Sequence, residues 1–402
     1  MHIDRRHSRK LFRKRQRRGG CLTFFVLLAL ITSIGLLTWQ RVGDFLHWNS
    51  NPAVNADLSQ LTSAFQSGQL DKVIKLASQI RESNPHNIPA LVMLIRSLIY
   101  RSYSDYDHAH DRQQAKDIVL AALADFPDHP DILAIYALVL NNESSYKEAN
   151  KIALDVIDSY PLHVVARIAL AQAYGAQGGF DASLREANKA IELAQTYAPE
   201  WLVDAYRIKA IAYSDLGQYA DAIAVIDLAL QQNHYLLPLY FERALYALQI
   251  GNTDLASISY FQVLAFDDGN VKSRLRLCEL TSTLRERETA IQYCSDVTGL
   301  APQWADAWYF LGREYFLQGN FTAAQDVLHK CSSLQIMQNI PIPERRFECW
   351  YLQGQAAEIR GDCPALLATY NEYLEMATHP EIEKTWVYPP EGPSICVDPA
   401  PH

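Results

Sequence analysis

The sequence predicts an all-α protein in which helix pairs stack into a solenoid, preceded by one transmembrane helix. Two features predict the solenoid: glycines that recur at a spacing near 34 residues, as between Gly217 and Gly251, and segments of helical apolar periodicity on both sides of each glycine. A period of about 20 to 50 residues is typical of repeat architectures. The third feature, a charge-free run at residues 21–39, predicts the transmembrane helix.

Residues 1–20 form a basic tail, with nine Lys and Arg residues against the single acidic residue Asp4. The 19 residues of the segment 21–39 would span roughly 28 Å as a helix, close to the hydrocarbon thickness of a bilayer. Dense basic charge before such a segment holds the N-terminus in the cytoplasm. We therefore expect a single-pass signal-anchor helix with an extracytoplasmic remainder. The alternative is a cleaved signal peptide, but the sequence offers no Ala-x-Ala-like site for cleavage.

The part of the chain after the basic tail is acidic. The whole chain has 36 Lys and Arg and 45 Asp and Glu residues, which leaves 27 and 44 in residues 21–402 and a net charge of −17. Nucleic-acid binding needs a positive face, so we expect no nucleic-acid partner. The expected partners are the lipid bilayer, through residues 21–39, and other proteins.

Residues 57–378 divide into about nine helix–turn–helix units, after a linker at residues 40–56 and with an insertion near residues 101–112. A glycine at the turn supplies the left-handed conformation that ends the first helix of a unit. In one unit Arg285 stands where this glycine is expected. A single helix pair cannot bury its apolar face alone, so neighbouring pairs must stack.

The best-defined unit resembles the tetratricopeptide repeat family. The residues that match the family pattern are Trp308, Leu311, Gly312, Tyr315, Gly319, Phe321 and Ala324. The resemblance implies a right-handed superhelical solenoid whose concave groove is lined by the first helix of each pair. It also implies protein binding rather than catalysis.

Helical phase in the strongest units selects the residues that face this groove. The expected partner-binding residues are Asp204, Arg207, Phe241, Glu242, Arg276, Glu279, Tyr309, Phe310, Arg313 and Phe316. Aromatic residues interleaved with arginine are enriched at protein-recognition surfaces. Some of them could instead pack against neighbouring helices. We expect the partner to present an amphipathic helix or an extended apolar segment.

Six cysteines lie in the last third of the chain, and none forms a Cys-x-x-Cys pair. An even number of cysteines on the extracytoplasmic side suggests disulfides. Helix phase places Cys278 opposite Cys294 within one unit, and Cys331 next to Cys349 in consecutive units. Cys363 and Cys396 then remain as the third pair. The alternative is that Cys278, Cys294 and Cys331 are small core residues.

Two segments depart from the repeat pattern. The insertion contains His108 and His110 with flanking aspartates, which makes them weak candidates for a zinc or copper site. A solvated loop or a partner contact are the other interpretations, and we expect no metal and no cofactor. The proline-rich tail at residues 379–402 excludes a long helix, and its aromatic residues favour packing as a cap on the last unit.

The sequence therefore favours a membrane-anchored extracytoplasmic scaffold for envelope protein assembly or quality control. A fixed structural subunit of a secretion, pilus or cell-wall machine is the alternative. No nucleophile elbow, phosphate loop or zinc-protease motif appears in the sequence. We therefore expect no enzyme, and an accessory subunit of an enzyme is a weaker possibility.

Overall fold

The computed structural model describes residues 52–380 and 385–397. The predicted basic tail and the segment 21–39 lie outside these residues. No helix within the described ranges has both the length and the apolar character needed to cross a bilayer. The chain divides into two compact units, Met1–Gln60 and Leu61–His402, and the contacts described below lie within the second.

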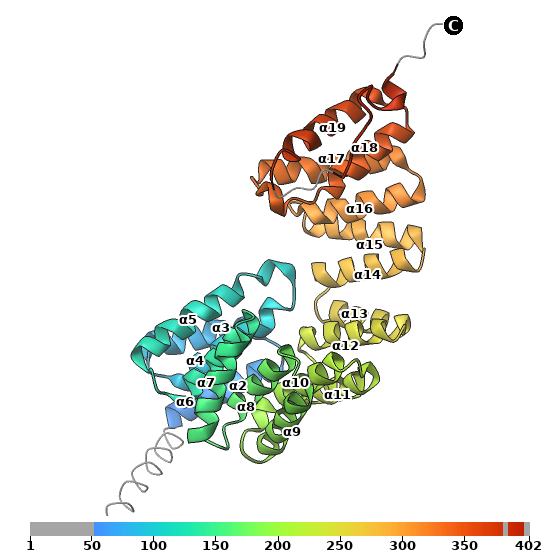
Figure 1. Cartoon of the computed structure of the whole chain (residues 1–402). Coiled ribbons are helices and arrows are strands. Elements are labelled where there is room, and N and C mark those ends of the chain that lie inside the picture. The colour runs from blue at the N-terminus through green and yellow to red at the C-terminus, as the bar shows by residue number, and fades with distance from the viewer. Residues whose placement is uncertain (1–51, 381–384, 398–402) are drawn as a thin grey trace, which may run out of the picture. The chain divides into compact units, whose positions relative to one another are not determined.

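The described residues form consecutive helix pairs and contain no β-strand (Figure 1). The first described helix, α2 (Pro52–Gln66), includes residues 52–56 of the predicted linker. The nine pairs are α2 (Pro52–Gln66) with α3 (Leu70–Ser83), α4 (Ile88–Ser102) with α5 (Asp111–Asp125), α6 (Pro130–Asn142) with α7 (Tyr146–Ser159), α8 (Val164–Ala176) with α9 (Phe180–Tyr197), α10 (Leu202–Asp215) with α11 (Tyr219–Gln232), α12 (Leu237–Gln249) with α13 (Thr253–Phe266), α14 (Val271–Thr283) with α15 (Arg287–Leu300), α16 (Ala305–Gln318) with α17 (Phe321–Met337), and α18 (Glu348–Ile359) with α19 (Cys363–Met376).

The turn inside a pair uses a left-handed residue in eight of these nine pairs. Six are glycines with φ between 69° and 85°, namely Gly68, Gly178, Gly217, Gly251, Gly319 and Gly361. The other two are Ser144, with φ 62°, and Arg285, with φ 64°. The turn geometry is therefore kept even where the sequence lacks glycine.

Small residues let the two helices of a pair approach closely. Ala210 and Ala244 are fully buried. At Gly312 a Cβ atom would lie 2.5 Å from Cγ of Leu328, on the second helix of the same unit. This close approach explains why the sequence places small side chains at that position of the repeat.

Residues 103–110, hereafter the strap, connect α4 to α5 and reach across to α14. The carboxylate of Asp105 accepts hydrogen bonds from the backbone N–H groups of Val271 at 2.8 Å and Lys272 at 3.0 Å. The side chain of Asn270 donates to the carbonyl oxygen of Ser104 at 3.1 Å. The strap thus caps the N-terminus of a helix that lies more than 160 residues later in the chain.

A second long-range contact joins α4 to α10. The buried guanidinium of Arg96 forms an ion pair with Asp204 and donates to the carbonyl oxygen of Glu200 at 2.8 Å. It lies between the rings of Phe65 and Trp201, at 4.1 and 4.2 Å from their centroids. These contacts connect helices from the second and fifth pairs.

The last pairs carry the cysteines. The structure places the expected partners at bonding distance, with Cα–Cα separations of 5.4 Å for Cys278–Cys294, 6.0 Å for Cys331–Cys349 and 5.2 Å for Cys363–Cys396. The first two bridges are buried in the helical core. The third connects α19 to the tail.

The tail packs along the last pair. Trp386 is 5% exposed and fills the space beside Gly354, where a Cβ atom would lie 2.2 Å from the indole ring. The hydroxyl of Tyr373 accepts hydrogen bonds from the backbone N–H groups of Thr385 and Trp386. The tail therefore covers the apolar end of the solenoid, as the terminal repeat of such an array requires.

Candidate binding groove

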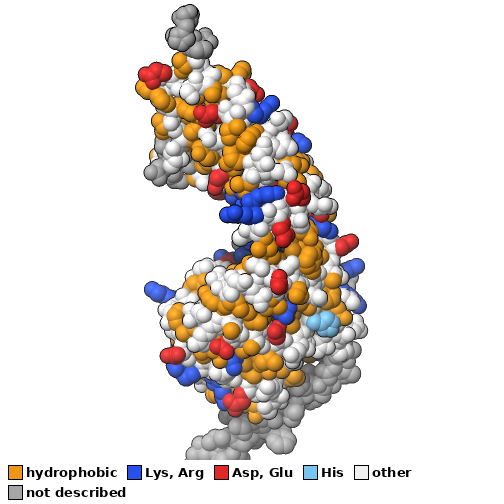
Figure 2. Space-filling model, turned by 90° about the vertical axis from the view of Figure 1, so that its right-hand side faces the viewer, with side chains coloured by type: hydrophobic (Ala, Val, Ile, Leu, Met, Phe, Trp, Pro, Cys, Tyr) orange, Lys and Arg blue, Asp and Glu red, His pale blue; other side chains and the backbone are white. Residues whose placement is uncertain are grey.

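A cavity of about 730 Å³ lies between the strap and the helices α10, α12 and α14. Five of the ten expected groove residues line it: Arg207, Phe241, Glu242, Arg276 and Glu279. A hollow with Lys and Arg side chains gathered at its edge is visible on the face shown in Figure 2. The volume is in the range of small-molecule or side-chain pockets.

Helical periodicity sets the lining of the cavity. On α12, Phe241, Leu245 and Leu248 repeat at intervals of three and four residues, so they share one face. On α14, Lys272 and Arg276 are four residues apart, so they also share one face. Leu245 is 52% exposed, although it is a large apolar residue, which marks this face as an exposed apolar surface.

Two ion pairs fix charged side chains on the cavity wall. Arg207 on α10 pairs with Glu242 on α12 at 2.5 Å, and Arg276 pairs with Glu279 on the next turn of α14 at 2.6 Å. The second oxygen of Glu242, Oε2, is buried and has no hydrogen-bond partner among the residues that the structure describes. An acceptor left unpaired in this way is costly, but protein atoms cover it, so it is not open to the cavity.

Lys272 is the third cation of the cavity. Its Nζ atom lies 4.2 Å from the ring centroid of Phe241 and donates to the carbonyl oxygen of Tyr103 at 2.6 Å. Burial, together with the nearby positive charge of Arg276, lowers the pKa of Lys272 to about 8. The carboxylates of Asp105 and Glu242 oppose this shift but do not cancel it.

The predicted residues on α16 form a second, more closely packed stretch. Arg346 lies 4.7 Å above the ring of Tyr309 and 5.6 Å from that of Phe310, and it pairs with Asp306 at 2.5 Å. Phe316 packs on Phe321 with ring centroids 5.3 Å apart. These aromatic side chains are half-buried and are engaged by neighbouring helices.

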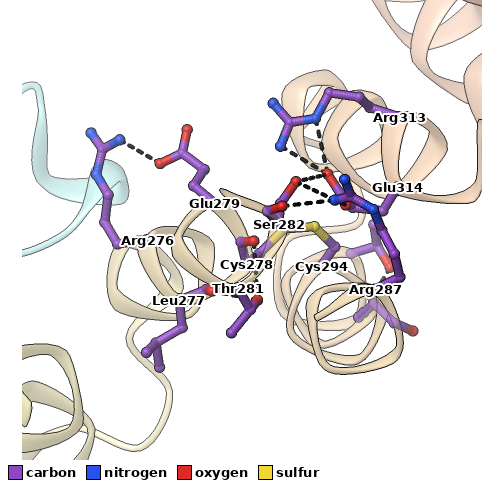
Figure 3. Close-up of a disulfide and its surroundings, with 12 residues drawn as sticks. Arg276, Leu277, Cys278, Glu279, Thr281, Ser282, Arg287, Cys294, Arg313 and Glu314 are labelled. Atoms are coloured by element: carbon purple, nitrogen blue, oxygen red, sulfur yellow. Dashed lines mark hydrogen bonds and ion pairs between the residues drawn. A yellow bond between two sulfur atoms is a disulfide. The ribbon is translucent and has the colours of Figure 1, made fainter. Parts of the chain in front are cut away.

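Figure 3 shows how α14 and α16 orient their charged groups around the Cys278–Cys294 bridge. Arg276 and Glu279 lie on one side of α14, away from the bridge. Glu314, which is fully buried, accepts hydrogen bonds from Ser282 at 2.7 Å, Arg287 at 3.0 Å and Arg313 at 2.9 Å. Arg313 is therefore tied to a structural network at the edge of the groove.

Asp204 does not face the groove as a free carboxylate. It is 8% exposed, and its oxygens bind the guanidinium of Arg96 and the hydroxyl of Tyr100. Helix phase predicted that Asp204 lies on the same face of α10 as Arg207. In the structure, Arg96 and Tyr100 of α4 contact this turn of α10 and bury Asp204. The lone arginine in the apolar stretch IPALVMLIRSLIY of α4 was the available signal, since a buried charge needs a partner.

The strap residue Tyr103 lines the cavity but was not predicted as a site residue. The two histidines of the insertion lie apart from the cavity: His108 pairs with Asp107 and His110 with Asp111, both at 3.4 Å. The carboxylate of Asp111 is already bound by Arg101. Within residues 52–380 and 385–397, no group of three or more His, Cys, Asp or Glu side chains is placed to hold a metal ion.

Residues 305–335, which cover α16 and most of α17, match the tetratricopeptide repeat family model. A tetratricopeptide repeat protein from Cytophaga hutchinsonii is similar in structure, with a TM-score of 0.51 and 15% identity over 61% of this chain and 95% of that one. The chain has the fold of tetratricopeptide repeat proteins. No curated protein matches it in sequence.

Two further solved structures are less similar by TM-score. The Cut9-Hcn1 hetero-tetramer of the APC/C gives a TM-score of 0.48 at 16% identity, over 76% of this chain and 56% of that chain. The match thus spans little more than half of the length of that protein. YrrB, described as a tetratricopeptide repeat protein with an unusual peptide-binding site, gives 0.36 at 18% identity over 46% of this chain and 92% of that one.

Proposed function

We propose that this protein is a membrane-anchored extracytoplasmic scaffold that binds segments of other proteins in its groove. The observation that carries the proposal is the cavity between the strap and α12, where Phe241, Leu245 and Leu248 present apolar surface beside charged side chains. Rigid helices hold these side chains in place, which lowers the entropy lost on binding. Apolar anchors with arginine nearby are typical of interaction surfaces.

A matched pair of crosslinking positions tests the groove. Leu245 and Ile258 belong to the same helix pair and are 52% and 51% exposed, but only Leu245 lines the cavity. A photoreactive amino acid at residue 245 should capture protein partners in cells, whereas the same group at residue 258 should capture few. Equal capture at the two positions would exclude the groove as the binding surface.

The membrane anchor rests on the sequence and on the cysteine pairs. The charge-free segment 21–39 follows nine basic residues, and three cysteine pairs lie at bonding distance. Disulfides persist in oxidising compartments, which favours an extracytoplasmic solenoid. Extraction of membranes with alkaline carbonate should leave the full chain in the pellet, and deletion of residues 1–39 should release it. Release of the full chain by carbonate would overturn the anchor.

The identity of the captured partners refines the proposal. Purification in mild detergent should yield a varied set of partners for a scaffold in assembly or quality control. One partner at fixed stoichiometry would instead indicate a permanent subunit of a larger machine.

A further inference from the structure

The cations of the cavity differ in how their charge is neutralised. Arg207 and Arg276 each pair with a carboxylate within 2.6 Å. Among the residues that the structure describes, Lys272 has no such ion pair, because its ammonium contacts only the carbonyl oxygen of Tyr103 and the ring of Phe241. An ammonium group has three donors, so two of them are available to a ligand.

The strap produces this arrangement. Asp105 caps α14 through the N–H groups of Val271 and Lys272, and Tyr103 supplies the carbonyl that orients the Lys272 side chain. The strap also closes one side of the groove, since Tyr103 lines the cavity. A side chain that enters therefore meets Lys272 in partly desolvated surroundings, where an ion pair is stronger than in water.

The charges that line the cavity favour an acidic ligand. Its lining contains Arg207, Lys272 and Arg276 against Glu242 and Glu279, an excess of one positive charge. This excess lies within a chain whose residues 21–402 carry a net charge of −17, so it is a local feature. One carboxylate on the ligand would balance it.

The rest of the lining fits a peptide better than a small anion. Leu245 and Leu248 remain 52% and 37% exposed beside the charged groups. A segment that combines a carboxylate and an apolar side chain satisfies both features.

We propose that this cavity binds an extended peptide segment through one Asp or Glu side chain, which pairs with Lys272, next to a bulky apolar side chain that packs on Leu245 and Leu248. The inference rests on the proposed function, because it names the class of segment that the groove takes. It assigns the strap a role in specificity: the strap positions Lys272 and limits the cavity to one carboxylate.

Selection from random peptides displayed on phage tests the inference with the full chain in detergent. Wild-type protein should enrich peptides with Asp or Glu next to Leu, Ile or Phe. Lys272→Gln should lose the acidic preference and keep the apolar one, which also shows that the variant is folded. Lys272→Arg should keep both preferences. Lys189→Gln, which removes an exposed lysine paired with Glu192 on α9, is the matched control and should select as wild type.

The outcomes separate the inference from the proposed function. Loss of all enrichment in Leu245→Asp, with an unchanged acidic preference in Lys272→Gln, would keep the groove and overturn the role of Lys272. Identical selection by wild type and Leu245→Asp would overturn the groove itself. Enrichment of basic or purely apolar peptides by the wild type would overturn the inference alone.

Affinity as a function of pH gives a second readout. The pKa of Lys272 is lowered to about 8 by burial and by Arg276. The other charged groups around it are Asp105, Glu242 and Arg112. An acidic peptide needs the protonated amine, so its affinity should fall about tenfold between about pH 7 and 9. Lys272→Arg should abolish the fall, and a wild-type affinity independent of pH would contradict the ion pair.

Discussion

The contacts that stabilise the helices before α14 differ from those that stabilise the chain after the first turn of α14. In the earlier part, contacts join residues far apart in the chain: Arg96 pairs with Asp204, and Asn233 donates to the carbonyl oxygen of Phe65 at 3.0 Å. In the later part, the side-chain hydrogen bonds described here join the same or neighbouring pairs, such as Ser282 to Glu314. All three disulfides lie there.

This difference has a physical reason. Each repeat of a solenoid contacts only its neighbours, so its stability is close to a sum of repeat and interface terms. The contacts of α4 with α10 and of the strap with α14 add long-range terms to that sum. Among the described residues, the contact that the strap makes with the pairs after α14–α15 is that of Tyr106 with Trp304, whose tilted rings have centroids 4.8 Å apart. Covalent bridges and the packed tail stabilise these later pairs instead.

The largest expected effect comes from breaking the long-range ion pair. Arg96→Met leaves Asp204 buried without a counter-ion, which should lower the free energy of unfolding by about 3–5 kcal/mol. Urea denaturation measures this loss, and hydrogen exchange should localise it to α4 and α10. Lys189→Met is the control, because Lys189 forms an exposed pair with Glu192 on the same helix and its loss should cost about 1 kcal/mol or less. Similar losses for both variants would contradict the importance of the long-range contact.

Removal of a bridge should affect the later part alone. The double substitution of Cys278 and Cys294 by alanine opens a loop of 16 residues, which should destabilise the protein by about 3 kcal/mol in the chain-entropy model. Faster hydrogen exchange should be confined to α14–α17. Reduction of the wild type opens all three bridges, so it should destabilise the protein further and extend the faster exchange to α18, α19 and the tail. Alkylation of all seven cysteines in the unreduced, unfolded full chain would show that the bridges do not form.

The cap that the strap forms on α14 should contribute less to stability than the Arg96–Asp204 ion pair or the Cys278–Cys294 bridge. Asp105→Ala removes the acceptor for two N–H groups at the start of α14, and loss of such a cap costs about 1 kcal/mol. Exchange of the amide hydrogens of Val271 and Lys272 should become faster. His108→Ala, on the same strap, should leave these amides unchanged, because the contact described for His108 is with Asp107. Slow exchange of both amides in Asp105→Ala would exclude the cap.

Local patterns predicted most of the fold. Turn glycines and apolar periodicity depend on residues within one unit, so the helix pairs and the cavity-lining faces of α10, α12 and α14 follow from them. A solenoid accumulates a small rotation at every repeat, and apolar periodicity in the sequence does not specify that rotation. The return of the strap onto α14 and the burial of Asp204 against Arg96 therefore could not be predicted. The same limit explains why Tyr103 was missed as a lining residue.

The smallest effect concerns a turn in the crosslinked part. Arg285 holds a left-handed conformation with φ 64°, at the position where Gly217 has φ 73° in an earlier unit. This conformation costs a residue with a Cβ atom about 1–2 kcal/mol. Arg285 is exposed, so Arg285→Gly should raise the free energy of unfolding by about 1 kcal/mol, reduced by the greater freedom of glycine in the unfolded chain.

The reverse substitution completes the test. At Gly217 an added Cβ atom would meet nothing within 4 Å, so Gly217→Ala changes the backbone preference without a clash. It should lower the free energy of unfolding by about 1 kcal/mol. If the Cys278–Cys294 bridge, rather than the turn, holds α14 against α15, Arg285→Gly should stabilise the protein more after reduction than before it. An equal gain in both states would show that the turn and the bridge act independently.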